Sequence, residues 1–176
     1  ISSDRRLLAL LVAWCFGGFM EGMAGFGTAV AIPAGMLAGL GFEAVPAVLI
    51  CLLANGVPTP YGSIGIPTVS VADLVGLDPL HLATVQLVQL APFFVVMPLL
   101  IVLVAGRVAD DQGNVASVSE RLHGVAGVAL LSGVSFVGAA LVVAMFVGPE
   151  LAVVVGSIVS LALTAALAMH AEKSGH

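Results

Sequence analysis

The chain has 176 residues, of which 60% are hydrophobic and only 9% are charged, and its formal net charge is −5. A soluble domain carries about 25% charged residues because most of its surface faces water, so this composition excludes an ordinary soluble globule. Five Lys and Arg residues are also too few for the basic stripe that binds nucleic acid. We therefore expect an all-α membrane protein, a polytopic helical bundle embedded in the lipid bilayer.

The first apolar block follows Arg5 and Arg6 and is interrupted at Glu21. We expect residues 7–42 to form a membrane span followed by a Gly-rich hairpin. Placing an ionisable side chain near the bilayer centre costs about 3 kcal/mol or more. Such a side chain between two apolar runs therefore usually faces a cavity or a partner. We interpret Glu21 as a candidate proton-coupling carboxyl. The alternative is that Glu21 ends a short helix at the interface and meets lipid headgroups.

Glycines follow Glu21 closely, and they predict a tight turn that leaves backbone amides free. Gly25, Gly27 and Thr28 are therefore candidates for substrate binding. Thr28 is also well placed to cap the helix that begins next, since a Thr hydroxyl accepts a hydrogen bond from an amide of the first turn.

The second block, residues 44–72, carries no charge, but residues 55–68 contain three prolines and three glycines. Proline removes an amide donor and clashes with the preceding turn, so this block should be a discontinuous helix. A broken membrane helix offers free amides at the positive end of a half-helix, which suits a carboxylate. The candidate substrate-binding residues here are Asn55, Thr59, Ser63, Gly65 and Thr68. An ordinary loop outside the membrane is the alternative.

Three later runs, 82–106, 122–148 and 151–171, are long enough to be transmembrane helices. Basic residues that flank spans stay in the cytoplasm, so the loop 107–121 should be cytoplasmic. The same rule places Arg5, Arg6, Arg107, Arg121 and Lys173 on one side. The number of crossings between Arg6 and Arg107 must then be even, although three apolar blocks lie there. One of these blocks should therefore re-enter and return on its own side.

Several sequence blocks together resemble signatures of the L-lactate permease family. They are Glu21-Gly-Met-Ala-Gly-Phe-Gly-Thr-Ala-Val-Ala-Ile-Pro33, Gly39-Leu-Gly-Phe42, Cys51-Leu-Leu-Ala-Asn55, Gly62-Ser-Ile-Gly-Ile-Pro67, Asp78-Pro-Leu-His81 and Gly148-Pro-Glu-Leu151. The resemblance implies a proton-coupled symporter for lactate, glycolate or a related 2-hydroxy monocarboxylate in the bacterial plasma membrane. It also implies an inverted-repeat transporter, of which this chain would be an interior fragment that needs the remainder of the permease.

Other functions remain as alternatives. A transporter of a different organic anion, or a non-transporting membrane scaffold, would share most of these features. A membrane enzyme would need a nucleophile and a base on neighbouring helices, such as a G-x-S-x-G serine, and the sequence offers none. Neither Cys15 and Cys51 nor the histidines have metal-ligand spacing. We therefore expect no enzyme activity, no metal and no cofactor.

Overall fold

The computed structural model describes residues 4–25, 27–107 and 116–173, and this part of the chain is helical without any strand. The predicted all-α fold is therefore confirmed. The elements are α1 (Arg5–Ala9), the π-helix η1 (Leu10–Phe16), α2 (Gly17–Met23), α3 (Thr28–Gly39), α4 (Ala44–Gly56), the 3-10 helix η2 (Thr59–Tyr61), α5 (Gly62–Val75), α6 (Pro79–Ala105), α7 (Val118–Leu122), α8 (Ala126–Phe146) and α9 (Pro149–Lys173).

Four helical stretches in the described residues are long and apolar enough to cross a membrane. They are Arg5–Met23, Pro79–Ala105, Ala126–Phe146 and Pro149–His170. The helices Ala44–Gly56 and Thr59–Val75 form one further candidate as a pair, although they are bent by 69° at the break between them. The predicted polytopic bundle with a broken segment is thus confirmed.

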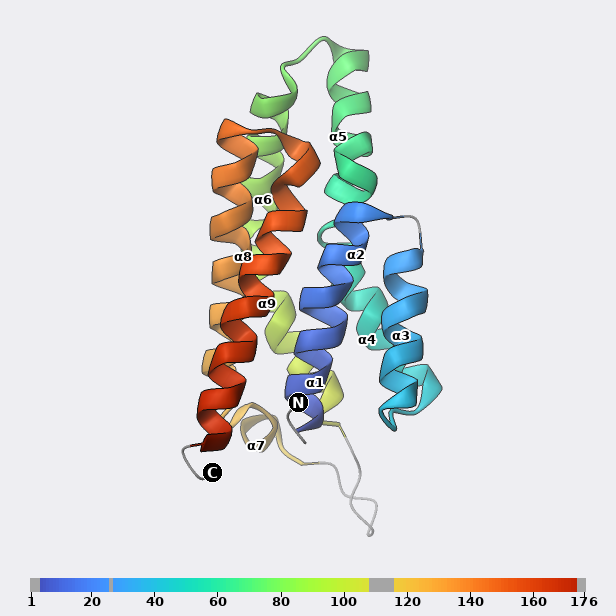
Figure 1. Ribbon diagram of the computed structural model, residues 1–176, viewed down its shortest axis with the longest axis vertical. Helices are drawn as coiled ribbons and strands as arrows, with labels where there is room; N and C mark the ends of the chain where they lie inside the picture. The colour runs from blue at the N-terminus through green and yellow to red at the C-terminus, as the bar shows by residue number, and fades with distance from the viewer. Residues whose placement is uncertain (1–3, 26, 108–115, 174–176) are drawn as a thin grey trace.

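The path of the chain distinguishes the two interrupted blocks (Figure 1). The stretch α1–η1–α2 rises from the end of the bundle where the N-terminus lies, and α3 runs back beside it toward the same end. At 1.5 Å per residue, the twelve residues of α3 give a helix of about 18 Å, too short for a hydrocarbon core of about 30 Å. By contrast, α4 and α5 together continue to the far end, from which α6 returns.

The core holds the N-terminal hairpin against the long helices. The ring of Trp14 in η1 lies 5.9 Å from Phe94 of α6 and 5.1 Å from Phe136 of α8, measured between ring centroids. Such tilted and edge-on aromatic pairs stabilise a buried interface. Gly133 permits α8 to approach α6 closely, because a Cβ there would lie 2.5 Å from the carbonyl oxygen of Phe94.

A buried polar cluster joins η1 to α8 and α9. The hydroxyls of Ser132 and Ser160 are hydrogen-bonded at 2.8 Å, and the Cys15 thiol lies 3.5 Å from the Ser160 hydroxyl. Their burial is complete or nearly so. Interhelical hydrogen bonds of this kind hold membrane helices together where lipid offers no polar partner.

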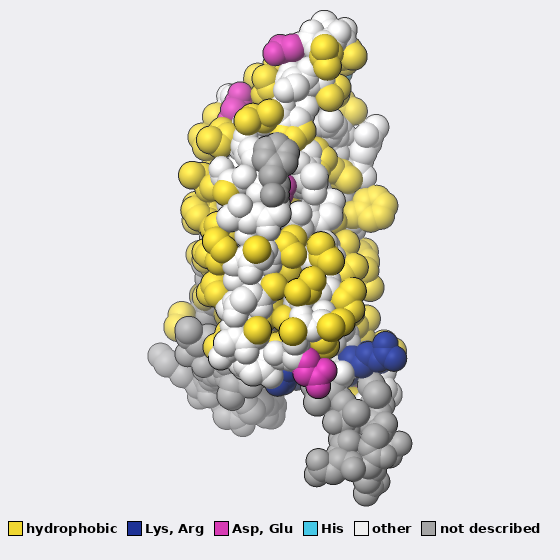
Figure 2. Space-filling view, turned by 90° about the vertical axis from the view of Figure 1, so that its right-hand side faces the viewer, with side chains coloured by type: hydrophobic (Ala, Val, Ile, Leu, Met, Phe, Trp, Pro, Cys, Tyr) yellow, Lys and Arg dark blue, Asp and Glu magenta, His cyan; other side chains and the backbone are white. Residues whose placement is uncertain are grey.

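The outer surface is apolar along its flank and charged at its ends. Figure 2 shows hydrophobic side chains covering the flank, and on this face the Lys and Arg side chains occur only at the lower end. Part of the predicted loop 107–121, residues 108–115, lies outside the described residues. Its last part forms α7, whose start is fixed by a capping box between Ser117 and Glu120.

Candidate functional site

Glu21 occupies the end of α2, close to the tip of the N-terminal hairpin. Its side chain is only 2% exposed, and its Oε2 atom has no hydrogen-bond partner in the described structure. The side-chain amide of Asn55, at the end of α4, donates a hydrogen bond to the carboxyl. Counted from Arg5 at 1.5 Å per residue, Glu21 lies about 24 Å along the hairpin. An acidic group is therefore buried far from the charged end of the bundle.

The glycine turn after Glu21 reverses the chain. Gly25 and Gly27 have φ angles of +51° and +97°, which only glycine adopts without strain. The expectation that Thr28 caps the following helix is wrong. Gly27 occupies the N-cap position of α3 without any side-chain cap, so Thr28 already belongs to the first helical turn.

The break between α4 and α5 has an unusual backbone. Three successive residues, Ser63, Ile64 and Gly65, adopt left-handed φ angles of +48°, +59° and +71°. A left-handed conformation costs an L-residue about 1–2 kcal/mol. One compensating contact is the hydrogen bond that the Ser63 hydroxyl donates to the carbonyl oxygen of Ala24, at 2.9 Å.

The glycine turn and the helix break meet at Glu21, a contact that the sequence could not establish. A Cβ on Gly25 would lie 2.5 Å from the Ser63 hydroxyl, and a Cβ on Gly62 would overlap Oε1 of Glu21. Both glycines are buried. The structure therefore brings four candidates together, which are Glu21, Gly25, Asn55 and Ser63.

The candidates Thr59 and Thr68 form hydrogen bonds around the helix break instead of contacting the Glu21 carboxyl. Thr59 is exposed and donates to the carbonyl oxygen of Asn55 at 2.8 Å. Thr68 is 1% exposed, and its hydroxyl lies 2.7 Å from the Pro60 carbonyl oxygen and 2.8 Å from Oε1 of Gln86. Thr68 thus fastens the two sides of the break to α6.

Two candidate glycines also lie away from the Glu21 carboxyl. Gly27 is exposed, and a Cβ there would meet no atom within 4 Å. Gly65 packs against the start of α9, where a Cβ would lie 2.8 Å from the carbonyl carbon of Pro149. Gly65 therefore allows a close helix contact.

Sequence reasoning missed Gly62 and the start of α9. The first turns of α9 also contact the hairpin, because a Cβ on Gly22 would lie 3.1 Å from the amide nitrogen of Val154. The start of α9 entered the sequence analysis only through the Gly148–Leu151 block of the family resemblance. Gly62 lies within the quoted Gly62–Pro67 block, which was the only signal that pointed to it.

The helix ends determine the electrostatics around Glu21. The regular part of α5 begins beside the site, just after the break at Ser63, Ile64 and Gly65, and the free amides at a helix start carry a partial positive charge. The four arginines of the described chain lie away from Glu21. They are at the start of α1, just after α6 and in α7, at the end of the bundle where the N-terminus lies. Within the described residues, no group of three or more His, Cys, Asp or Glu side chains could hold a metal ion. An anion here would be held by amides and neutral polar groups.

Comparison with known proteins gives a consistent set of relatives. The sequence model described as L-lactate permease matches residues 1–174. The chain is 40% identical over 164 residues to an L-lactate permease of Streptococcus iniae. This alignment covers 93% of the chain and 32% of that relative. It is 39% identical over 166 residues to an L-lactate permease of Bacillus subtilis, covering 94% and 27%.

A relative with a different stated substrate is also similar. The chain is 34% identical over 161 residues to a glycolate permease of Escherichia coli, which covers 92% of the chain and 27% of that protein. The chain thus spans about a third or less of the length of these relatives. No solved structure matches it.

Proposed function

Because the chain belongs to the L-lactate permease family, we propose that it forms part of a secondary transporter for short 2-hydroxy monocarboxylates such as lactate or glycolate. The transport is coupled to protons and takes place across the bacterial plasma membrane. The similarity to lactate and glycolate permeases supports the substrate class. The family is one of multi-pass membrane transporters, not of enzymes.

One observation carries the proposal, namely the buried Glu21 carboxyl in contact with the helix break. A buried carboxylate without a cation is costly, whereas the protonated acid needs only a hydrogen bond. The side-chain hydrogen-bond partner of Glu21 is Asn55, and the Oε2 atom has no partner among the described residues. It can therefore take up a proton in one state of the transporter and release it in another.

The substrate carboxylate would bind beside Glu21 at the positive ends of the half-helices. Free amides at a helix start attract an anion without a buried Arg or Lys. The Asn55 amide, which has two N–H donors, supplies a further hydrogen-bonding group at this place, whereas the Ser63 hydroxyl already donates to the Ala24 carbonyl. Protonation of Glu21 would remove the negative charge that otherwise repels the substrate, which is a physical reason for the two to travel together.

A transport assay on the full-length permease tests this proposal. Reconstituted protein should accumulate labelled L-lactate when an inward proton gradient is imposed, and an uncoupler should abolish the accumulation. Glu21→Gln should lose gradient-driven accumulation by more than tenfold but keep exchange of internal for external lactate, because exchange needs no net proton transfer.

The matched control is Asp73→Asn, which removes an exposed carboxyl from α5 at the other end of the bundle and should leave both activities unchanged. Two results count against the proposal. Absence of gradient-driven uptake of any short hydroxy acid by the unmodified protein would favour a scaffold or another substrate. Unchanged accumulation in the Glu21→Gln variant would remove Glu21 from the coupling step.

A further inference from the structure

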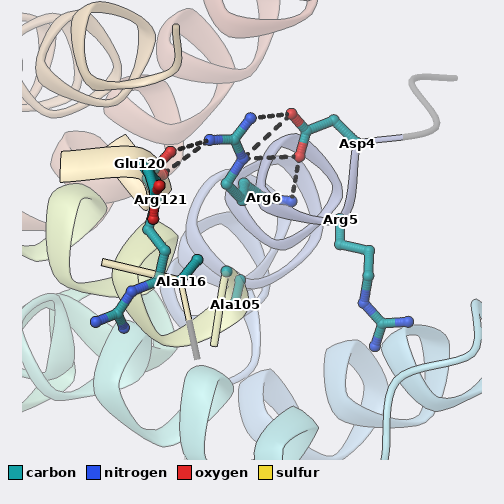
Figure 3. Close-up of a pocket in the computed structure, with 8 residues that line it drawn as sticks. Asp4, Arg5, Arg6, Ala105, Ala116, Glu120 and Arg121 are labelled. Atoms are coloured by element: carbon teal, nitrogen blue, oxygen red, sulfur yellow. Dashed lines mark hydrogen bonds and ion pairs between the residues drawn. The ribbon is translucent and has the colours of Figure 1, made fainter. Parts of the chain in front are cut away.

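Four arginines gather at the end of the bundle where the chain starts, and they differ in how well their donors are satisfied. Arg6 is fully engaged, as Figure 3 shows. Its guanidinium forms an ion pair with Asp4 at 2.7 Å and donates to the carbonyl oxygens of Arg121 and His123 at 2.8 and 3.1 Å. Burial alone would raise the pKa of Asp4, but the bonds and charge of Arg6 outweigh it and hold that pKa below its ordinary value. Arg6 therefore fastens α1 to α7.

Arg5 points away from Arg6, to the other side of α1 (Figure 3). Its guanidinium lies 4.2 Å from the ring centroid of Phe42, and Nη1 donates to the carbonyl oxygen of Gly41 at 3.1 Å. Its Nε atom is buried and has no hydrogen-bond partner among the described residues. An unpaired buried donor on a cation is costly, so Arg5 retains the capacity to bind an acceptor.

A cavity of about 390 Å³ lies between Arg5 and Arg107. Arg107 is exposed, and its guanidinium forms no hydrogen bond or ion pair with the described residues. The exposed carboxyl of Glu43 also lines the cavity, so the two arginines leave one net positive charge. The volume falls within the range of about 300–1,000 Å³ typical of ligand sites.

The rest of the cavity wall is apolar. It includes Ile50 of α4 and Val104 and Ala105 of α6. Next to the cavity, α4 also presents Val45 and Leu49 to the surroundings, with 71% and 49% of each residue exposed. A ligand with one anionic group and a hydrocarbon portion matches this combination better than a small soluble anion does.

We propose that this cavity binds the phosphate of an anionic phospholipid between Arg5 and Arg107, with an acyl chain along α4. Basic pockets between membrane helices suit such headgroups, because guanidinium groups pair with phosphate oxygens and the surrounding field favours negative charge. A neighbouring cavity of about 350 Å³ is also lined by arginines. Three arginines and the carboxyls of Asp4 and Glu120 line it, so it has the same single net positive charge. There, however, Arg6 is already paired with Asp4, and Arg121 donates to the carbonyl oxygen of Leu103.

The test is the thermal unfolding of the full-length permease in neutral detergent during titration with defined lipids. Phosphatidylglycerol should raise the unfolding midpoint saturably, whereas phosphatidylcholine should not. Arg107→Gln should weaken the apparent affinity for phosphatidylglycerol about fivefold, since each basic residue contributes about 1 kcal/mol. Glu43→Gln removes the opposing charge at the same cavity and should strengthen binding.

Arg107 is preferred to Arg5 for this test because its side chain is exposed and forms no hydrogen bond or ion pair with the described residues, so the variant should remain folded. Inorganic phosphate serves as the soluble anion and should have no comparable effect. A response to phosphate equal to that of phosphatidylglycerol would overturn the lipid assignment. Equal titrations for the unmodified protein and the Arg107→Gln variant, or equal effects of both lipids, would overturn the site itself.

Discussion

The approach of the helix break to the Glu21 carboxyl depends on one glycine. Gly62 has φ and ψ of −62° and 156°, which are open to any residue, so its importance is steric. A methyl group at this position would overlap Oε1 of Glu21. The position of the Glu21 carboxyl and its hydrogen bond from Asn55 therefore both require that residue 62 has no side chain.

We predict that Gly62→Ala lowers the stability of the full-length protein by about 1–3 kcal/mol, the usual cost of overpacking a filled interior. It should also reduce lactate uptake, because the carboxyl must move away from Asn55. Stability can be measured by unfolding in a denaturing detergent, and uptake in proteoliposomes.

The matched control is Gly56→Ala, six residues earlier at the end of α4. A Cβ there would meet no atom within 4 Å, and Ala is favoured over Gly within a helix by about 0.5–1 kcal/mol. This variant should be as stable as the unmodified protein or slightly more stable, with normal uptake. Equal losses in both variants would contradict the close contact between Gly62 and Glu21.

The broken helix is the element on which the site depends, and its geometry stores strain. Ser63 and Ile64 hold left-handed conformations that L-residues avoid. Their neighbours keep them there, through the bond from Ser63 to the hairpin and the packing of Gly65 on the start of α9. The break is therefore maintained by tertiary contacts and is not only a consequence of its prolines.

Replacing Ile64 with glycine should relieve this strain. The gain of about 1–2 kcal/mol exceeds the entropic cost of about 0.4–1 kcal/mol for a glycine in the unfolded chain. Ile64→Gly should therefore leave stability unchanged or raise it slightly. Ile66→Gly is the control, because Ile66 is similarly exposed, at 53% against 49%, but has a helical backbone.

The Ile66→Gly variant should lose about 1 kcal/mol, the cost of glycine in a helix. The measurement is the difference in the free energy of unfolding between the two variants, in the same full-length protein. If Ile64→Gly proves as destabilising as Ile66→Gly, the left-handed conformation assigned to Ile64 would be contradicted.

The sequence predicted the helices and the two parts of the site for clear physical reasons. Long uncharged runs identify membrane helices, and prolines and glycines locate the interruptions. The contact between Gly62 and Glu21 could not be predicted, since it depends on how two separate segments pack. The role of the α9 start was hidden for the same reason, because Pro149 is typical of any turn. The π-helix at Leu10–Phe16 carries no residue pattern that distinguishes it from an α-helix.

At the scale of the whole molecule, the central feature is a hairpin that enters the bundle and returns. The stretch α1–α3 begins and ends on the side of the arginines, whereas α4 and α5 together reach the opposite end (Figure 1). This arrangement brings the tip of the hairpin, with Glu21, to the break in the neighbouring helix. It also satisfies the even number of crossings that the basic residues require, and we propose that the arginine side is cytoplasmic.

Single-cysteine accessibility in intact cells tests this arrangement most directly. Three exposed positions of the full-length protein are suitable, which are Glu43 between α3 and α4, Leu77 between α5 and α6, and Ser119 in α7. The native Cys15 and Cys51 are buried, and the unmodified protein gives the background labelling. A membrane-impermeant thiol reagent added outside should label Leu77→Cys only, and Glu43→Cys and Ser119→Cys should react only after the membrane is opened. Labelling of Glu43→Cys from the same side as Leu77→Cys would contradict the return of α3 to the arginine side, and with it the meeting of Glu21 and the helix break.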